Sequence, residues 1–269
     1  MNAAAGDYAP NLERFTGFAE TYDRHRPPPP TALAGLLMDL ARAPKPDLVV
    51  DLGSGTGLST RYWADRAQAV IGIEPTPDMR WQAEAQANAK NISYRAGFSH
   101  ATGLPDHCAQ IVVCCQSLHW MDPPGTFREA ARILVPGGVF AACDYDWPPA
   151  TGVGEADAAF AACLENVRRV ERELGAGVHQ WDKAGHVARM TASGCFREVR
   201  EILLHHTEAG DAERFVGLLL SQGHVMGLLK RGVSETAIGL DVFRAAAVLA
   251  LGPEPRPWRW SARLRVGIV

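Results

Sequence analysis

The segment VVDLGSGTGL at residues 49–58 constrains the fold of this chain more than any other. A short apolar run ends in Asp51 and passes directly into a loop with Gly53, Gly55 and Gly57 at every second position. This pattern is typical of a buried parallel strand that leads into a helix whose N-terminus faces a ligand. Glycines at these positions allow the backbone to approach that ligand closely.

A second apolar run, residues 69–73, ends at Glu74. In doubly wound folds, a carboxylate at the end of the second strand accepts hydrogen bonds from the hydroxyls of a nucleotide ribose. The glycine loop and Glu74 together predict a site for an adenosine-containing cofactor.

Three features argue against a dinucleotide in that site. After Gly57 the chain continues with Leu58, whereas the dinucleotide fingerprint needs a third glycine one place later. Asp51 would repel a pyrophosphate, but it suits the ammonium group of an amino-acid cofactor. The alternating segment at residues 258–266, a predicted antiparallel strand, also does not belong to the cofactor-binding half of a dehydrogenase. These features disfavour a nicotinamide oxidoreductase.

Short apolar runs alternate with helical segments through the first half of the chain. This order predicts an α/β fold with a doubly wound, mostly parallel Rossmann-like sheet. The predicted strands are residues 47–51, 69–73, 92–95, 111–115 and 139–145, the last entered through a tight turn at 136–138. The predicted helices are residues 11–23, 31–41 with Thr31 as N-cap, 59–66, 77–89 and 126–134.

The last segment has a different period. From Trp258 to Val266 apolar residues alternate with Arg259, Ser261, Arg263 and Arg265. Strict alternation predicts a half-exposed C-terminal antiparallel strand near a sheet edge, with residues 199–206 as its partner and the arginines on a solvated face.

Two helical stretches, residues 155–174 and 212–251, lie outside the alternation. They follow strands whose carboxyl ends face the cofactor crevice, so they are placed either to form a lid or to cover sheet surface. The expected divisions are an N-terminal arm over the cofactor site (1–30), a cofactor-binding core (31–148), a lid insertion (149–180), a core helix and strand (181–210), lid helices (211–255) and the terminal strand (256–269).

Composition excludes several other classes of protein. The formal net charge of −3 gives no reason to expect a nucleic-acid partner, and no apolar run is long enough to span a membrane. The six cysteines lack C-x-x-C spacing and the nine histidines lack metal-binding spacing, so reduced, packed cysteines and no metal are expected. We expect a cytoplasmic protein.

Six motifs in order carry a resemblance to a known family. They are FAETYDRHRP (18–27), the glycine loop, IEP (73–75) with Asp78 and Met79, TGLP (102–105), QSLHW (116–120) and RILVPGG (132–138). In these motifs the chain resembles the class I S-adenosylmethionine-dependent methyltransferases, most closely the methyltransferase-11-like type such as trans-aconitate methyltransferase relatives. The resemblance covers residues 15–145. It departs from the usual pattern at His100, where an acid is common, and at Gln110, where an aspartate is usual.

The resemblance implies that S-adenosyl-L-methionine is the cofactor and S-adenosyl-L-homocysteine the product. Its methionine part would lie against Gly53, Ser54, Gly55 and Gly57, with Asp51 on the ammonium side. The remaining implied contacts are Glu74 with the ribose, Pro75, Met79, Phe98 and Ser99 with the adenine, Gln116 and Ser117 with the amine, and Tyr22 and Arg26 with the carboxylate. Two of these residues have simpler alternatives, because Phe98 would also fit a core position and Arg26 a surface one.

Methyl transfer from a sulfonium needs little from the protein beyond positioning, exclusion of water and removal of a proton. His119, directly after the fourth strand, is the candidate base, although a histidine that only bonds to backbone fits equally well. Trp120, Tyr145 and Trp147 are candidate substrate contacts. The leading hypothesis is methyl transfer to a small-molecule oxygen or nitrogen acceptor. RNA or protein methylation, and a non-catalytic regulatory protein that binds the cofactor, are the alternatives, and the oligomeric state stays open.

Overall fold

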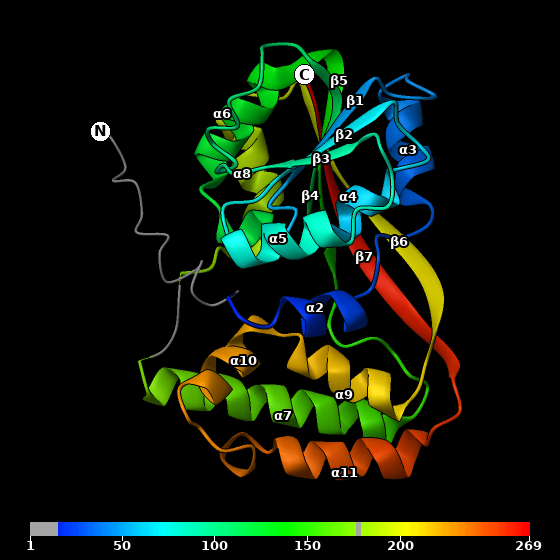
Figure 1. Ribbon diagram of the computed structural model, residues 1–269, viewed down its shortest axis with the longest axis vertical. Helices are drawn as coiled ribbons and strands as arrows, with labels where there is room; N and C mark the ends of the chain where they lie inside the picture. The colour runs from blue at the N-terminus through cyan, green and yellow to red at the C-terminus, as the bar shows by residue number, and fades with distance from the viewer. Residues whose placement is uncertain (1–15, 176–178) are drawn as a thin grey trace.

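A seven-stranded sheet forms the centre of the protein in the computed structural model, which describes residues 16–175 and 179–269 (Figure 1). The strand order is β3-β2-β1-β4-β5-β7-β6. The strands are β1 (Leu48–Leu52), β2 (Ala69–Ile73), β3 (Ile92–Arg95), β4 (Ala109–Cys115), β5 (Leu134–Tyr145), β6 (Glu198–Gly210) and β7 (Arg256–Ile268). The first five run parallel, and β7 is antiparallel to both β5 and β6. The predicted mostly parallel sheet with an antiparallel C-terminal strand is therefore confirmed.

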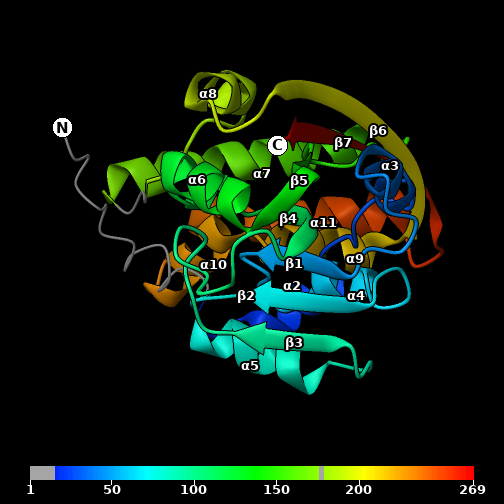
Figure 2. The ribbon, with the colours of Figure 1, turned by 90° about the horizontal axis from the view of Figure 1, so that it is seen from above.

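Helices cover both faces of the parallel part (Figure 2). On one face α3 (Leu33–Leu40) packs on apolar side chains of β1, β4 and β5. On the other face α6 (Pro123–Ile133) and α8 (His186–Ser193) pack on the alternate side chains of the same strands. Both faces are buried, which explains the near-continuous apolar runs of these strands. The short helices α4 (Leu58–Tyr62) and α5 (Pro77–Ala85) follow β1 and β2.

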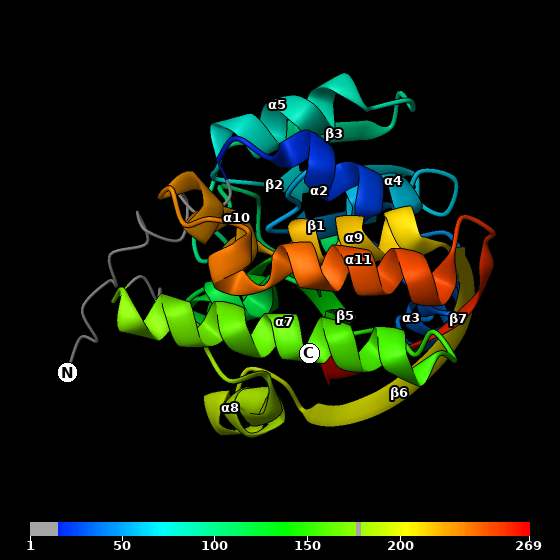
Figure 3. The ribbon, with the colours of Figure 1, turned by 90° about the horizontal axis from the view of Figure 1, so that it is seen from below.

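A group of helices lies beyond the carboxyl ends of the parallel strands (Figures 1 and 3). It consists of α7 (Gly154–Glu173), α9 (Ala212–Leu220), α10 (Gly223–Lys230) and α11 (Leu240–Leu251). The long strands β6 and β7 extend down to it, and Trp258 of β7 packs on Phe215 of α9 with ring centroids 5.3 Å apart. One apolar core therefore runs from the sheet into the helical group.

The N-terminal helix α2 (Ala19–His25) lies between the sheet and this group (Figure 1). Part of the helix predicted over residues 11–23 falls on residues 11–15, outside the described residues. Thr31 is not the N-cap of α3; Ala32 occupies that place, without a side-chain cap.

The predicted turn at residues 136–138 is an irregularity inside β5. Ala109 pairs with Leu134, but Ile111 already pairs with Val139, so β5 accommodates extra residues at this point. Gly137 has a φ of +81° and donates its N–H to the carbonyl of Val269 at 3.0 Å. Pairing with the end of the chain thus keeps the glycine turn within the sheet.

The prediction that Arg265 faces solvent is wrong. Its side chain is only 2% exposed, and its guanidinium pairs with Asp144 of β5 and Glu201 of β6, each at 3.0 Å. Arg259 and Arg263 are exposed as predicted. The alternation fails at Arg265 because α8 packs on β6 and β7, and every residue from 264 to 268 is buried there.

Among the described residues, no helix has the length and apolar character needed to cross a membrane.

Candidate functional site

A cavity of about 730 Å³ lies at the carboxyl ends of β1, β2, β4 and β5. Residues of α2, α7 and the junction between α9 and α10 close it from the opposite side. Sixteen of the eighteen predicted site residues line this cavity: Tyr22, Arg26, Gly53, Ser54, Gly55, Glu74, Pro75, Met79, Phe98, Ser99, Gln116, Ser117, His119, Trp120, Tyr145 and Trp147. The other two, Asp51 and Gly57, do not line it.

Two glycines of the loop have different surroundings: open space adjoins Gly55, whereas the side chain of Tyr94 packs against Gly57. Gly55 has a φ of +54°, and nothing lies within 4 Å of the place where a side chain would begin, so the cavity extends to its backbone. Gly57 has a φ of +83°, and a Cβ there would overlap the hydroxyl of Tyr94. The structure thus needs glycine at Gly57 for packing, whereas the space beside Gly55 is free for a ligand.

Glu74 holds the loop in place from the end of β2. Its carboxylate accepts hydrogen bonds from the N–H of Gly55 at 2.9 Å and from the N–H of Thr76 at 2.8 Å. Burial raises the pKa of Glu74, and these two backbone donors oppose the rise. A buried acid is therefore presented to the cavity with its position fixed.

Asp51 lies behind the loop, with no exposed surface. The Thr60 hydroxyl donates to one carboxylate oxygen at 2.7 Å, and the other oxygen has no hydrogen-bond partner. Burial raises the pKa of Asp51 to about 7, although hydroxyl donors oppose it. Asp51 therefore ties β1 to α4 behind the loop.

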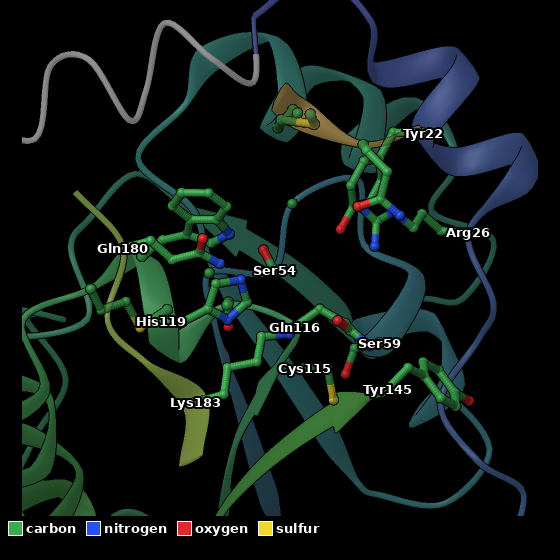
Figure 4. Close-up of a pocket in the computed structure, with 18 of the residues that line it drawn as sticks. Tyr22, Arg26, Ser54, Ser59, Cys115, Gln116, His119, Tyr145, Gln180 and Lys183 are labelled. Atoms are coloured by element: carbon green, nitrogen blue, oxygen red, sulfur yellow. The ribbon is translucent and has the colours of Figure 1, made fainter. Parts of the chain in front are cut away.

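The end of β4 turns sharply into the cavity. Gln116 has a left-handed φ of +58°, which its N–H stabilises by donating to the carbonyl of Cys143 at 2.8 Å. The Ser117 hydroxyl donates to the carbonyl of Leu52 at 2.8 Å and so ties this turn to β1. The Gln116 Nε2 and Ser54 Oγ atoms are buried without a hydrogen-bond partner (Figure 4). Such orphaned polar atoms around an open space are suited to a polar ligand.

His119 lies in η1 (Leu118–Trp120), immediately after this turn. It is 4% exposed, and its Nδ1 lies 3.4 Å from Oδ1 of Asp144, the penultimate residue of β5. Burial and the nearby Lys183 ammonium lower the pKa of His119 to about 4. The histidine is therefore neutral at neutral pH and lines the cavity.

Asp144 is the centre of a buried charge cluster. Lys183, in η2 (Lys183–Gly185), places its Nζ 3.0 Å from Oδ1, and Arg265 places its Nη1 3.0 Å from Oδ2. Burial alone would raise the pKa of Asp144, but Lys183 and His119 beside it hold that pKa well below its usual range. The carboxylate is thus charged and compensated by two cations.

Arg26 lies at the other side of the cavity, between two aromatic rings. Its guanidinium carbon is 4.8 Å from the ring centre of Tyr22 and 4.7 Å from that of Trp147. Its Nη2 donates to the carbonyl of Ser221 at 3.1 Å and to Gln222 at 3.2 Å. Its Nε has no partner, and no carboxylate of the described residues lies within 4.0 Å. The alternative that Arg26 is a surface charge is wrong, because its guanidinium lines the cavity and packs between the rings of Tyr22 and Trp147.

The remaining predicted contacts surround the opening near β2. Met79 is buried, Phe98 is 39% exposed and stacks on His100 with ring centroids 5.5 Å apart, and the Ser99 hydroxyl lies 2.7 Å from that of Thr126. Phe98 is therefore not a core residue. At the far side the Tyr145 hydroxyl donates to the carbonyl of Pro28 at 2.6 Å, which joins the N-terminal arm to β5.

Several lining residues carried no recognisable signal in the sequence. They come from the helical group and from the segment before α8: Leu164, Arg168, Glu171, Gln180, Lys183, Gln222 and Gly223. No motif marks them, and only the placement of the inserted helices after the strands suggested that this part of the chain would reach the cavity. Among the described residues no cluster of three or more histidines, cysteines or acids could hold a metal ion.

The cavity fits the predicted cofactor in three respects. Its volume lies within the range of about 300–1,000 Å³ that small-molecule sites occupy. The space beside Gly55 is open, and Glu74 is fixed next to it. The orphaned Gln116 Nε2 and Ser54 Oγ lie around the same space. The polar groups of the cofactor would thus find hydrogen-bond partners on Glu74, Gln116 and Ser54 around one cavity.

Comparison with known proteins gives a consistent result for the core. Residues 50–142 match the family described as a methyltransferase domain, Methyltransf_11. An uncharacterised methyltransferase of Mycobacterium tuberculosis is 36% identical over 125 residues, which is 46% of this chain and 49% of that protein. The chain thus spans about half the length of this curated relative. The 27-O-demethylrifamycin SV methyltransferase of Amycolatopsis mediterranei is 29% identical over 181 residues, 64% of this chain and 63% of that protein.

Solved structures share the fold. A putative type II methyltransferase from Anaeromyxobacter dehalogenans superposes with a TM-score of 0.62 at 23% identity, covering 90% of this chain and 97% of that one. The YcgJ protein of Bacillus subtilis superposes with a TM-score of 0.53 at 19% identity, covering 87% and 97%. The similarity therefore extends over the sheet and its helices.

Proposed function

Residues 50–142 match a methyltransferase domain, and on that premise we propose that the protein is a class I S-adenosylmethionine-dependent methyltransferase that transfers a methyl group to an oxygen or nitrogen atom of a small molecule. The observation that carries the proposal is the pairing of the open space at Gly55 with the fixed carboxylate of Glu74. Both belong to one cavity, which also contains His119.

The cofactor would be held by the residues predicted for it. Glu74 would accept hydrogen bonds from the ribose hydroxyls, and the loop from Gly53 to Gly55 would lie against the methionine part. The residues around the adenine would be Pro75, Met79, Phe98 and Ser99. Gln116 and Ser117 would bind the ammonium group through backbone carbonyls, and Tyr22 and Arg26 would close over the carboxylate. When bound, the cofactor supplies an electrophilic methyl group on a sulfonium.

Within this chain the chemistry needs one proton acceptor. His119 is neutral, lines the cavity and lies beside the turn that binds the ammonium end. It would take the proton of the acceptor's O–H or N–H, which would leave the acceptor atom a better nucleophile toward the methyl group that the cofactor would supply. Trp120, Tyr145 and Trp147 form the wall against which the acceptor packs.

The enclosure of the cavity favours a small acceptor. Leu164 and Arg168 of α7 and Gly223 of α10 cover the cavity from the side opposite the sheet. A polymer would have to pass between these helices. The formal net charge of −3 gives no general attraction for RNA. An O-methyl acceptor also agrees with the name of the rifamycin relative.

Titration calorimetry with S-adenosylmethionine and S-adenosylhomocysteine tests the cofactor site. We expect both to bind the wild-type protein, and Gly55→Val and Glu74→Ala to weaken binding at least about tenfold. Gly103→Val is the matched control, because Gly103 also has a positive φ, of +68°, with nothing within 4 Å, but lies outside the cavity. Equal binding by Gly55→Val and Gly103→Val would contradict the assignment.

A turnover assay tests the acceptor class. Formation of S-adenosylhomocysteine is measured against pools of small hydroxyl, carboxyl and amine compounds, total RNA and a protein lysate depleted of metabolites. Turnover with a small-molecule pool alone is the expected result. Turnover only with RNA or protein would replace the proposal by the corresponding alternative. Binding without turnover in any pool would favour a regulatory, cofactor-binding protein.

A further inference from the structure

The carboxylate of Asp144 contacts both His119 and two cations, and this arrangement bears on how His119 works. A lone carboxylate beside a buried imidazole would draw a second proton onto the ring and convert it into a donor. Here Lys183 lies 3.0 Å from the same oxygen that faces His119, and Arg265 binds the other oxygen. The charge of Asp144 is therefore already neutralised before it acts on the ring.

The groups around His119 come from four other elements. Asp144 belongs to β5, Lys183 to η2, Arg26 follows α2, and His186 begins α8. Both cations in this set oppose a positive charge on the ring, and burial lowers the pKa of His186 to about 4, so that it adds no charge at neutral pH. Only Asp144 favours protonation, and its charge is compensated.

We propose that Asp144 is a positioning residue that keeps the proton of neutral His119 on Nδ1, and that Lys183 prevents the same carboxylate from charging the ring. The Nε2 lone pair then faces away from Asp144 and accepts the acceptor's proton. The separation of 3.4 Å between Nδ1 and Oδ1 is long for a hydrogen bond, but the buried Nδ1 has no other hydrogen-bond partner, so Asp144 is the acceptor nearest to a proton on it. This inference rests on the proposed function for its purpose, but the state of His119 can be measured without any acceptor.

Two contacts hold Lys183 and Arg265 in place beside Asp144. The backbone N–H of Trp181 donates to the carbonyl of His119 at 2.9 Å, so the segment that carries Lys183 is fastened to η1. Arg265 continues the cluster to Glu201 of β6 at 3.0 Å, which fixes the guanidinium across the sheet. These contacts hold Lys183 and Arg265 beside Asp144.

Nitrogen-15 NMR of histidine-labelled protein tests the proposal, with His119→Gln to assign the signal. We expect His119 in the wild type to be neutral at pH 7 with its proton on Nδ1. In Lys183→Met the pKa of His119 should rise by about one unit or more, because Asp144 then acts on the ring with less compensation. Lys183→Arg should restore the wild-type titration. Lys90→Met, at an exposed lysine before β3, is the control and should leave it unchanged.

The second variant is Asp144→Asn, which should lose the single tautomer of His119. A proton on Nε2 in the wild type, or a His119 pKa that is the same in Lys183→Met and Lys90→Met, would overturn the inference. Calorimetry with S-adenosylmethionine on the same samples separates this outcome from a failure of the proposed function. Cofactor binding with the wrong tautomer rejects only the positioning role, and the expected tautomer without cofactor binding rejects only the proposed function.

Discussion

Arg265 on β7 and Asp144 on β5 form an ion pair of 3.0 Å in the interior of the protein, with side chains only 2% and 3% exposed. The pair connects the C-terminal antiparallel strand to the wall of the cavity, because Asp144 also contacts His119 and Lys183. In the unfolded chain Arg265, 121 positions from Asp144 along the sequence, would have no contact with the site. In the fold it belongs to the same buried cluster.

The first prediction concerns this pair. Arg265→Met leaves the buried carboxylate with one cation fewer, and breaking a buried pair is costly, so we expect a loss of about 3 kcal/mol or more in the free energy of unfolding. Arg259→Met, on the exposed face of the same strand, should change it little. Denaturant unfolding measures both. Equal stabilities of the two variants would show that the pair contributes nothing.

The second prediction concerns the pH dependence of stability. The pKa of Asp51 is about 7 in the folded protein and 3.8 when unperturbed, so between these values the folded chain binds a proton that the unfolded chain has lost. This group therefore stabilises the fold at low pH, and its contribution falls as pH rises from about 4 to about 7. In Asp51→Asn the group cannot titrate. Relative to the wild type, the variant should gain about 2–4 kcal/mol between pH 4 and pH 8, measured by urea unfolding. A difference that stays constant with pH would refute the shift.

The third prediction separates two glycines of one loop. Gly57→Ala should destabilise the protein by about 2 kcal/mol or more, because the new Cβ overlaps Tyr94 as well as straining the backbone. Gly55→Ala has the strain alone and should cost about 1 kcal/mol. Thermal unfolding in a Tyr94→Phe background provides the check: the cost of Gly57→Ala should shrink there and that of Gly55→Ala should not.

The fourth prediction concerns the attachment of α2. Arg26→Met removes the contacts with Tyr22 and Trp147 and the bonds to Ser221 and Gln222, so we expect faster amide hydrogen exchange in α2 and weaker cofactor binding. Arg24 is the matched control, because it also joins α2 to α9, through an exposed ion pair with Glu213 that contributes little. Exchange in Arg24→Met should equal that of the wild type. Equal exchange in both variants would mean that Arg26 does not hold the helix.

Most of the sheet could be predicted because its signals are local. The apolar run at residues 69–73 coincides with β2 and that at residues 111–115 lies within β4, since a strand covered on both faces requires an apolar residue at nearly every position. Errors arose where a distant contact decided the local structure. The sequence predicted a turn at residues 136–138, but pairing with Val269 holds these residues in β5. The sequence predicted Thr31 as the N-cap of the following helix, but α3 begins at Leu33 and its N-cap is Ala32.

The residues of the candidate site also fall into two groups: those that the sequence identified and those that only the fold brings to the site. The residues predicted to hold the cofactor lie near strand ends and in one loop, where residue type and position along the chain report the role, and most of them line the cavity. Lys183 and Arg265 could not be found, because a lysine in an unpatterned segment and an arginine in an alternating strand look like surface residues. Their positions depend on where η2 and β7 pack against Asp144.

The sequence by itself determined the strand–loop–helix order, the acid at the end of β2 and the resemblance to a methyltransferase family, because these depend on residues adjacent along the chain and on the short periods of strands and helices. Only the tertiary structure decided which charges are buried together and which helices close the cavity. The interaction of two charges depends on their distance and on the water around them, and both are set by packing between segments far apart in the sequence.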